Sequence, residues 1–210
     1  MMPNSSDANK VLHIQMRTET FFIPPGQKKE QSSTTTVELY SQQKKTAVLT
    51  PFTSTWQDED YLVTVVKPRK TVLITRSVPT NREVQLNAMS AFRDSLLQQG
   101  TVVMCEKGNN SAHETYVKLK LTKAASIRTH TQTMEFWLDD KHVLIKKLRV
   151  NYSVGQMQTH NIVTITKQEL LATSDVLMSS ARRQVLAVDG RLLPAYAGYR
   201  LVDQSVQRPK

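Results

Sequence analysis

Histidine and cysteine most often carry catalysis or hold transition metals, and this chain of 210 residues has five histidines and one cysteine. No two histidines stand three or four residues apart, the spacing that places two metal ligands on one helix face, and no second cysteine is available. Three of the histidines fall at strand positions that alternate with apolar residues, so we interpret the histidines as solvent-facing and expect no metal site. The histidines are His13, His113, His130, His142 and His160.

The single cysteine, Cys105, follows the apolar run Val102, Val103 and Met104. We interpret it as a small buried hydrophobic residue rather than a catalytic thiolate, because the sequence places no base beside it. One cysteine cannot form an internal disulfide, so cysteine usage does not indicate an oxidising compartment.

Acidic residues cluster at Asp58–Asp60 and at Asp139–Asp140. Both clusters lack the spaced oxygen ligands and the glycine of a calcium loop, so we interpret them as ordinary turns. The sequence also lacks a glycine-rich phosphate loop, a nucleophile elbow and a dinucleotide fingerprint. We therefore expect no catalytic residues, no cofactor and no enzymatic activity, although two carboxylates distant in sequence could still meet in a hydrolase site.

The net charge is +10, from 28 Lys and Arg against 18 Asp and Glu. This excess favours acidic partners, which include nucleic acid, anionic lipid and acidic protein surfaces. Because the basic residues occur in scattered pairs, a solvated basic surface is the simpler interpretation, and we expect no specific nucleic-acid binding. One predicted sheet surface could still hold an anionic partner beside Tyr116 and Trp137. Its basic residues are Lys118, Lys120, Lys146 and Arg149.

Most of the chain alternates apolar and polar residues, the period of a half-buried strand. In 116–122, for example, Leu119 and Leu121 are expected to face inward while Lys118 and Lys120 face outward. Residues 81–99 differ, because their apolar residues recur every three or four positions and Gly100 stands where a helix C-cap belongs. This pattern predicts one long helix.

These elements predict a mainly β (α+β) fold, a curved antiparallel half-barrel sheet of roughly ten strands with the long helix packed on its concave face. Residues 1–10 are expected to be disordered, 11–202 to form a single β-rich domain, and 203–210 to be a flexible tail. Within this domain, 184–193 are expected to form a hairpin with an Asp-Gly turn. We also expect Tyr196, Tyr199 and Leu201 to pin the end of the chain onto its body.

Two segments carry a resemblance to a known fold. Glu135–Lys141, an aromatic strand with an acidic turn, and the returning strand Leu144–Val150 resemble the late hairpin of the LolA/LolB-like lipoprotein-localisation fold. Upstream, Asp58–Val66, Lys67-Pro68 and Thr71–Ile74 are similar to the strand, turn and strand that lead to that family's helix. The order of elements agrees over roughly residues 10–166, but the N-terminal helix usual in the family is not evident.

The resemblance implies a sheet wrapped around a helix, with an apolar interior that accepts a lipid, an acyl chain or a hydrophobic peptide. The alternative is that this interior is simply packed core. The residues expected to line the interior are Val63, Val65, Phe92, Leu96, Leu119, Leu121, Phe136 and Leu138.

The leading functional hypothesis is therefore a non-enzymatic binding or scaffold protein of a bacterial envelope, with a lipid or an envelope protein as partner. The alternative is a structural or assembly module that binds an acidic protein or nucleic acid through the basic sheet face. No apolar run approaches the ~20 residues that span a bilayer, so we expect a protein that does not cross the membrane. The first ten residues have no apolar signal-peptide core, so a periplasmic location requires a leader that this sequence lacks, and a cytoplasmic location stays open.

Overall fold

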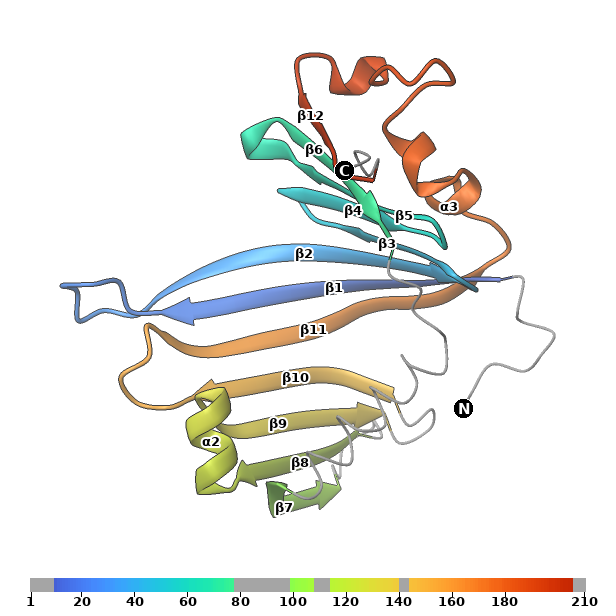
Figure 1. Cartoon of the computed structure of the whole chain (residues 1–210). Helices are drawn as coiled ribbons and strands as arrows, with labels where there is room; N and C mark the ends of the chain where they lie inside the picture. The colour runs from blue at the N-terminus through green and yellow to red at the C-terminus, as the bar shows by residue number, and fades with distance from the viewer. Residues whose placement is uncertain (1–9, 78–98, 108–113, 140–143, 206–210) are drawn as a thin grey trace. The chain divides into compact units, whose positions relative to one another are not determined.

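The computed structural model describes residues 10–77, 99–107, 114–139 and 144–205, and β-strands dominate these residues (Figure 1). The strands are β1 (Val11–Phe22), β2 (Gln31–Gln42), β3 (Lys45–Leu49), β4 (Thr53–Gln57), β5 (Tyr61–Val66), β6 (Thr71–Arg76), β7 (Gly100–Lys107), β8 (Glu114–Leu121), β9 (Thr131–Asp139), β10 (Leu144–Tyr152), β11 (Gln158–Leu171) and β12 (Arg200–Asp203). The helical segments are η2 (Lys67–Arg69), α2 (Lys123–Thr129), α3 (Asp175–Met178), η3 (Ala181–Gln184) and η4 (Pro194–Tyr196).

The strands of the described residues pair in the order β12-β6-β5-β4-β3-β2-β1-β11-β10-β9-β8-β7. Neighbours from β2 to β6 and from β7 to β11 run antiparallel, whereas β12 pairs with β6 in parallel. The predicted mainly β class, built on one large and mostly antiparallel sheet, is confirmed. The described strands number twelve rather than roughly ten.

The predicted long helix at 81–99, with Phe92 and Leu96, lies outside the described residues apart from Gln99. Its packing against the sheet therefore stays a prediction. The shorter helix α2 was not predicted. Thr122 caps it by accepting a hydrogen bond from the Ala125 backbone N–H, and His130 ends it at a positive φ of 54°.

The chain divides into two compact units. Among the described residues, unit 1 comprises 16–35, 99–107, 114–139 and 144–166, and unit 2 comprises 10–15, 36–77 and 167–205. Each unit is described here by itself. The prediction of a single domain at 11–202 stays a prediction.

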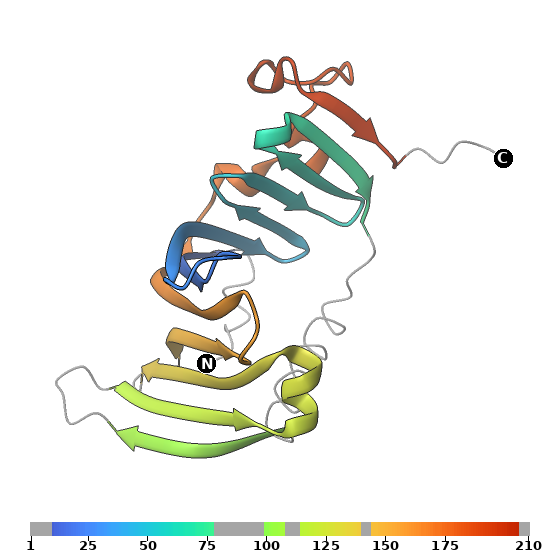
Figure 2. The same ribbon diagram turned by 90° about the vertical axis from the view of Figure 1, so that its left-hand side faces the viewer.

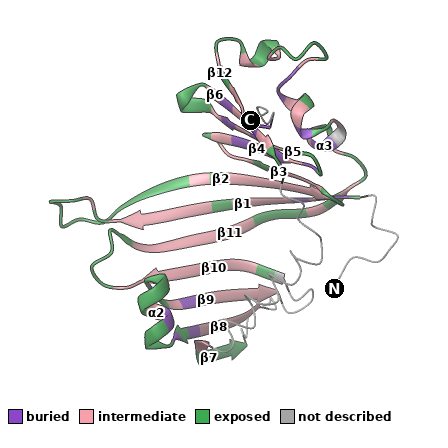
Figure 3. Cartoon of the chain, viewed as in Figure 1, coloured by how far each residue is buried: buried purple, intermediate pink, exposed green. Residues whose placement is uncertain are grey.

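The core of unit 2 lies between one face of β3–β6 and the segment that follows β11 (Figures 2 and 3). Strand pairing places Ala47, Trp56, Val63 and Ile74 in one row across four strands, all buried. α3 contacts β3, and η3 contacts β4 and β5. The covering side chains are Leu177, Ala181, Val185 and Leu186.

The end of the chain is attached to unit 2 as expected. Tyr196 and Tyr199 meet edge to face at 5.6 Å between ring centroids and pack against the core. The prediction is wrong for the Leu201 side chain, which is 38% exposed. Leu201 lies in β12, whose backbone hydrogen-bonds β6, and Gln204 donates its backbone N–H to the Ile74 carbonyl. Residues 203–205 of the expected tail therefore lie along β6, and 206–210 lie outside the described residues.

The predicted hairpin at 184–193 is confirmed, and its two arms pair through one isolated β-bridge. Leu186 pairs antiparallel with Leu192, and Ala187 donates its backbone N–H to the Arg191 carbonyl at 2.8 Å. Gly190 takes a φ of +82° in the turn between them, a conformation that suits glycine because it has no Cβ.

Candidate functional site

One face of the sheet in unit 1 is apolar across several strands. Register aligns Val117, Phe136 and Leu148 in one row, and Leu119, Met134 and Val150 in the next. Leu119, Leu121 and Met134 are buried, whereas the row through Phe136 keeps intermediate exposure (Figure 3). This surface, called below the apolar face, is the place in unit 1 where an apolar ligand could gain contact area.

The opposite face of the same strands carries charged and aromatic side chains around Glu135. Lys118 Nζ lies 3.4 Å from Glu135 Oε1, and Asn151 donates to the same oxygen at 3.0 Å. Asn151 also donates to Thr133 at 2.9 Å and accepts a bond from Arg149 Nε at 2.9 Å. The Glu135 carboxylate thus organises side chains from three neighbouring strands.

The aromatic rings of this charged face are also occupied. Lys147 Nζ lies 4.6 Å from the centroid of the Trp137 ring, and Tyr116 tilts against the same ring at 5.1 Å. Lys146 lies 3.1 Å from Glu114 Oε1 and 3.8 Å from Asp139 Oδ2. Such contacts compete with nucleobase stacking and with phosphate binding.

The structure therefore brings the four predicted basic residues to one region of unit 1 but gives most of them partners. Lys118 and Lys146 form ion pairs with carboxylates, and Arg149 bonds an amide oxygen. Lys120 is exposed. Their role toward an anionic partner stays a prediction.

Two ionisable groups beside this network have shifted pKa values. Burial, followed by the nearby Glu135 carboxylate, raises the pKa of Tyr116. Burial, followed by the positive charge of Arg149, lowers the pKa of His160, although Glu30 acts in the opposite direction. Both shifts favour the neutral side chain.

The interpretation of the strand histidines as solvent-facing is wrong for His160 and His13. The His160 ring stacks on Phe21 at 4.1 Å between centroids. The His13 side chain, in unit 2, is only 10% exposed and stacks on Tyr40 at 4.4 Å. The alternation within one strand does not indicate which aromatic side chain of another strand will cover its polar positions.

His13 belongs to a polar cluster in unit 2. Its Nδ1 lies 2.9 Å from Glu169 Oε1, Glu169 lies 2.7 Å from Lys167 Nζ, and Tyr40 donates its hydroxyl hydrogen to Glu38 at 2.8 Å. Burial, followed by the Glu38 hydrogen bond, raises the pKa of Tyr40 to about 12. Lys167, followed by His13, lowers the pKa of Glu169.

A histidine oriented by a carboxylate resembles part of a catalytic dyad. The other ring nitrogen, Nε2 of His13, is buried and has no hydrogen-bond partner among the described residues. A substrate therefore has no access to it, so the cluster is best explained as a contact that holds β1, β2 and β11 together.

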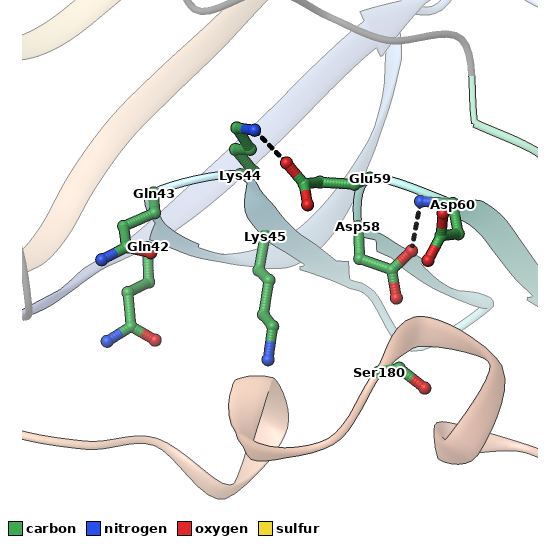
Figure 4. A pocket seen from close by; sticks show the side chains of 8 residues that line it. All are labelled: Gln42, Gln43, Lys44, Lys45, Asp58, Glu59, Asp60 and Ser180. Carbon is green, nitrogen blue, oxygen red and sulfur yellow. Dashed lines mark hydrogen bonds and ion pairs between the residues drawn. The ribbon is translucent and has the colours of Figure 1, made fainter.

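A polar hollow of about 480 Å³ lies in unit 2, where the β2–β3 and β4–β5 turns meet the C-terminal segment that follows β11 (Figure 4). Its lining residues are Gln42, Gln43, Lys44, Lys45, Asp58, Glu59, Asp60 and Ser180. This lining differs from the apolar interior that the resemblance implies for an acyl chain.

Asp58 makes the central contacts of the hollow. Its Oδ1 accepts the backbone N–H groups of Asp60 and Tyr61 at 2.9 and 2.8 Å, and its Oδ2 accepts that of Ala181 at 2.7 Å. The turn interpretation of Asp58–Asp60 is thus confirmed, and the same carboxylate tethers the C-terminal segment. Lys45 adds a bond from Nζ to the Leu177 carbonyl at 3.2 Å.

The predicted lining residues fall into three groups. Val63 and Val65 lie in unit 2, fully buried within its packed core. Leu119, Leu121, Phe136 and Leu138 share the apolar face of unit 1. Phe92 and Leu96 lie outside the described residues.

The interpretation of Cys105 as buried is wrong, because the cysteine is exposed on β7. Within the described ranges, no three or more His, Cys, Asp or Glu side chains lie close enough together to hold a metal ion. The described helices include none that is both long and apolar enough to span a bilayer.

No family model and no curated protein matches this sequence. Similar solved structures include an uncharacterized conserved protein from Thermus thermophilus, at 7% identity and a TM-score of 0.47, covering 95% of this chain and 93% of that one. A LolA superfamily protein from Nitrosomonas europaea, at 10% identity and a TM-score of 0.32, covers 83% and 95%. The MucA/MucB complex of Pseudomonas aeruginosa, at 15% identity and a TM-score of 0.32, covers 90% of this chain and 60% of that one. LolA superfamily proteins, the family inferred from the hairpin pattern, are thus among the similar structures.

Proposed function

We propose that this chain is a non-enzymatic binding or scaffold protein of the bacterial envelope, acting in the periplasm, and that unit 1 holds an apolar ligand. The ligand would be a lipid, an acyl chain or a hydrophobic peptide. The apolar face of β8–β10 is the observation that carries the proposal. The periplasmic assignment rests on the LolA/LolB-like pattern of 135–150.

The apolar face suits such a ligand because its rows are continuous across neighbouring strands and remain partly exposed in the row through Val117, Phe136 and Leu148. Each methylene of an acyl chain that is buried contributes about 0.8 kcal/mol, so a chain that covers several strands gains substantial binding energy. Polar groups capable of orienting a headgroup lie on the other face, which leaves the apolar face to select by hydrophobicity alone.

Among the predicted lining residues, we assign ligand contact to Phe136 and Leu138, which are partly exposed, whereas Leu119 and Leu121 are buried in the same face and would support it. Val63 and Val65 are closed off by the core of unit 2 and would support the fold instead. Phe136 is the residue to test, because it is large, partly exposed and central in its row.

The experiment is native mass spectrometry of gently purified protein, followed by titration with a fluorescent fatty acid. Phe136→Gln should weaken fatty-acid binding about tenfold or more, since loss of one large buried apolar contact costs about 1.5 to 3 kcal/mol. Ile127→Gln is the matched control, because Ile127 is an apolar residue of unit 1 that is 66% exposed on α2. Absence of both co-purified lipid and fatty-acid binding, or equal weakening by the two substitutions, would refute the proposal.

A further inference from the structure

The edge strand β7 exposes an unusual amount of apolar surface. Within the described residues it pairs on one side only, with β8, and Thr101–Lys107 are all exposed. Val102, Val103 and Met104 are 54%, 49% and 44% exposed, and Cys105 follows them. Apolar side chains therefore lie on both faces of the edge strand β7.

Edge strands normally carry features that prevent further pairing, such as proline, lysine in the middle of the strand, or a bulge. The middle of β7, Thr101–Cys105, contains neither proline nor charge. Its one protective feature is a register shift between Val102 and Met104, which leaves Val103 as the extra residue. Among the described strands, none pairs with the outer side of β7, so its backbone N–H and C=O groups there could bond another strand.

The register of β7 on β8 determines which side chains an added strand would meet. On the apolar face, Val102 lies opposite Leu119 and Cys105 opposite Val117. On the charged face, Met104 lies opposite Lys118 and Thr101 opposite Lys120. An added strand would therefore place alternate side chains beside apolar residues and the others near lysines.

The charge near the Thr101–Met104 part of this edge favours an acidic strand, whereas Glu106, which lies opposite Tyr116 on the same face, places a negative charge near the other end of β7. Lys120 is exposed, and its strand neighbours Thr101 and Thr133 are uncharged. Lys118 already pairs with Glu135, so an acidic side chain of the added strand would be attracted by both Lys118 and Lys120. A second copy of β7 is a poorer match, because its one acidic residue, Glu106, lies near the end of the strand.

We propose that the outer edge of β7 receives an extended segment of a partner protein whose residues alternate between apolar and acidic. Main-chain hydrogen bonds hold the segment, and the two faces of β7–β8 select its side-chain pattern. This edge site goes beyond the function proposed above, which concerns a ligand on the apolar face, and it does not depend on that ligand.

The test uses fluorescent peptides of about eight residues, the length of β7, with alternating Val and Glu. Binding is followed by fluorescence anisotropy, and the site by hydrogen exchange. The alternating peptide should bind and slow amide exchange in 100–107. Peptides that alternate Val and Lys, or that place Val and Glu in two separate blocks, should bind at least tenfold more weakly.

Two N-methylated peptides separate strand addition from simple surface adsorption. Methyl groups on the alternate amides that face β7 should abolish binding, whereas methyl groups on the other amides should leave it unchanged. On the protein, Met104→Glu should weaken peptide binding without changing fatty-acid binding, because it places a negative charge where the acidic side chains of the peptide are expected to lie. Ile127→Glu should change neither. Fatty-acid binding measured on the same samples distinguishes failure of this proposal from failure of the proposed function.

Three results would overturn the proposal. Equal binding of both N-methylated peptides would show that main-chain pairing is not involved. Protection from exchange that falls outside 100–107 would place the peptide elsewhere. Self-association abolished by Met104→Glu, with no peptide binding, would assign the edge to a second copy of this chain.

Discussion

Replacing Asp58 by alanine should loosen the C-terminal segment from the sheet of unit 2. The carboxylate accepts three backbone N–H groups, two in its own turn and one from Ala181, which is buried. Leaving the Ala181 N–H without a partner costs about 1 to 3 kcal/mol. Losing the two bonds in the turn, where water can substitute, costs about 0.5 to 2 kcal/mol, as for loss of a helix cap. The expected total is about 1.5 to 5 kcal/mol, or a fall of about 3 to 20 °C in melting temperature for a chain of this size.

The measurement is thermal or urea unfolding, together with hydrogen exchange at 177–186, where protection should fall most. Glu59→Ala is the matched control, because its ion pair with Lys44 joins side chains that are 58% and 72% exposed, and such pairs contribute at most about 1 kcal/mol. Asp58→Asn should have an intermediate effect, since the amide keeps one acceptor oxygen for the turn but presents an NH₂ group toward Ala181. If Asp58→Ala and Glu59→Ala destabilise equally, the tether is not what holds the segment.

Three further predictions concern titration. Tyr40, with a pKa of about 12, should ionise last in an absorbance titration of the six tyrosines, and Tyr40→Phe should remove this last phase. The stability that neutral Tyr40 contributes is complete below the ordinary tyrosine pKa of 10.0 and is lost as pH rises toward 12. The lowered pKa of Glu169 means that its contribution is present above its ordinary value of 4.5 and is lost as pH falls, and Lys167→Ala should raise that pKa in carboxyl NMR titrations. His160 should titrate below 6.5 because burial and Arg149 oppose its charge, so it destabilises the fold as pH falls through 6.5, and Arg149→Met should raise its pKa in NMR. An unchanged His160 pKa in Arg149→Met, or an unchanged Glu169 pKa in Lys167→Ala, would contradict the stated cause.

Period-two alternation predicted the faces of individual strands because it depends only on local geometry. In β8, Leu119 and Leu121 are buried and Lys120 is exposed, as their alternation predicted. The Asp-Gly turn at 189–190 was equally local, because glycine at a positive φ suits a tight turn without help from the rest of the fold.

Features that depend on distant pairing could not be predicted. His13 is covered by Glu169 and Tyr40, and nothing in the alternation around residue 13 indicates that these side chains will be its neighbours. The parallel pairing of β12 with β6 joins residues near 200 to residues near 71. The helix α2 was missed because seven residues are too few for a clear helical period, and its signal reduces to the Thr122 cap.

The charged face of unit 1 shows how register changes the meaning of a charge pattern. Lys118, Lys120 and Arg149 looked like a basic surface when each strand was considered alone. Pairing places Glu135 directly opposite both Lys118 and Arg149, so the carboxylate of the middle strand offsets part of the positive charge of its two neighbours. Lys120, two residues further along the same strand, has no carboxylate in register, because it has Thr133 on one side and Thr101 of β7 on the other.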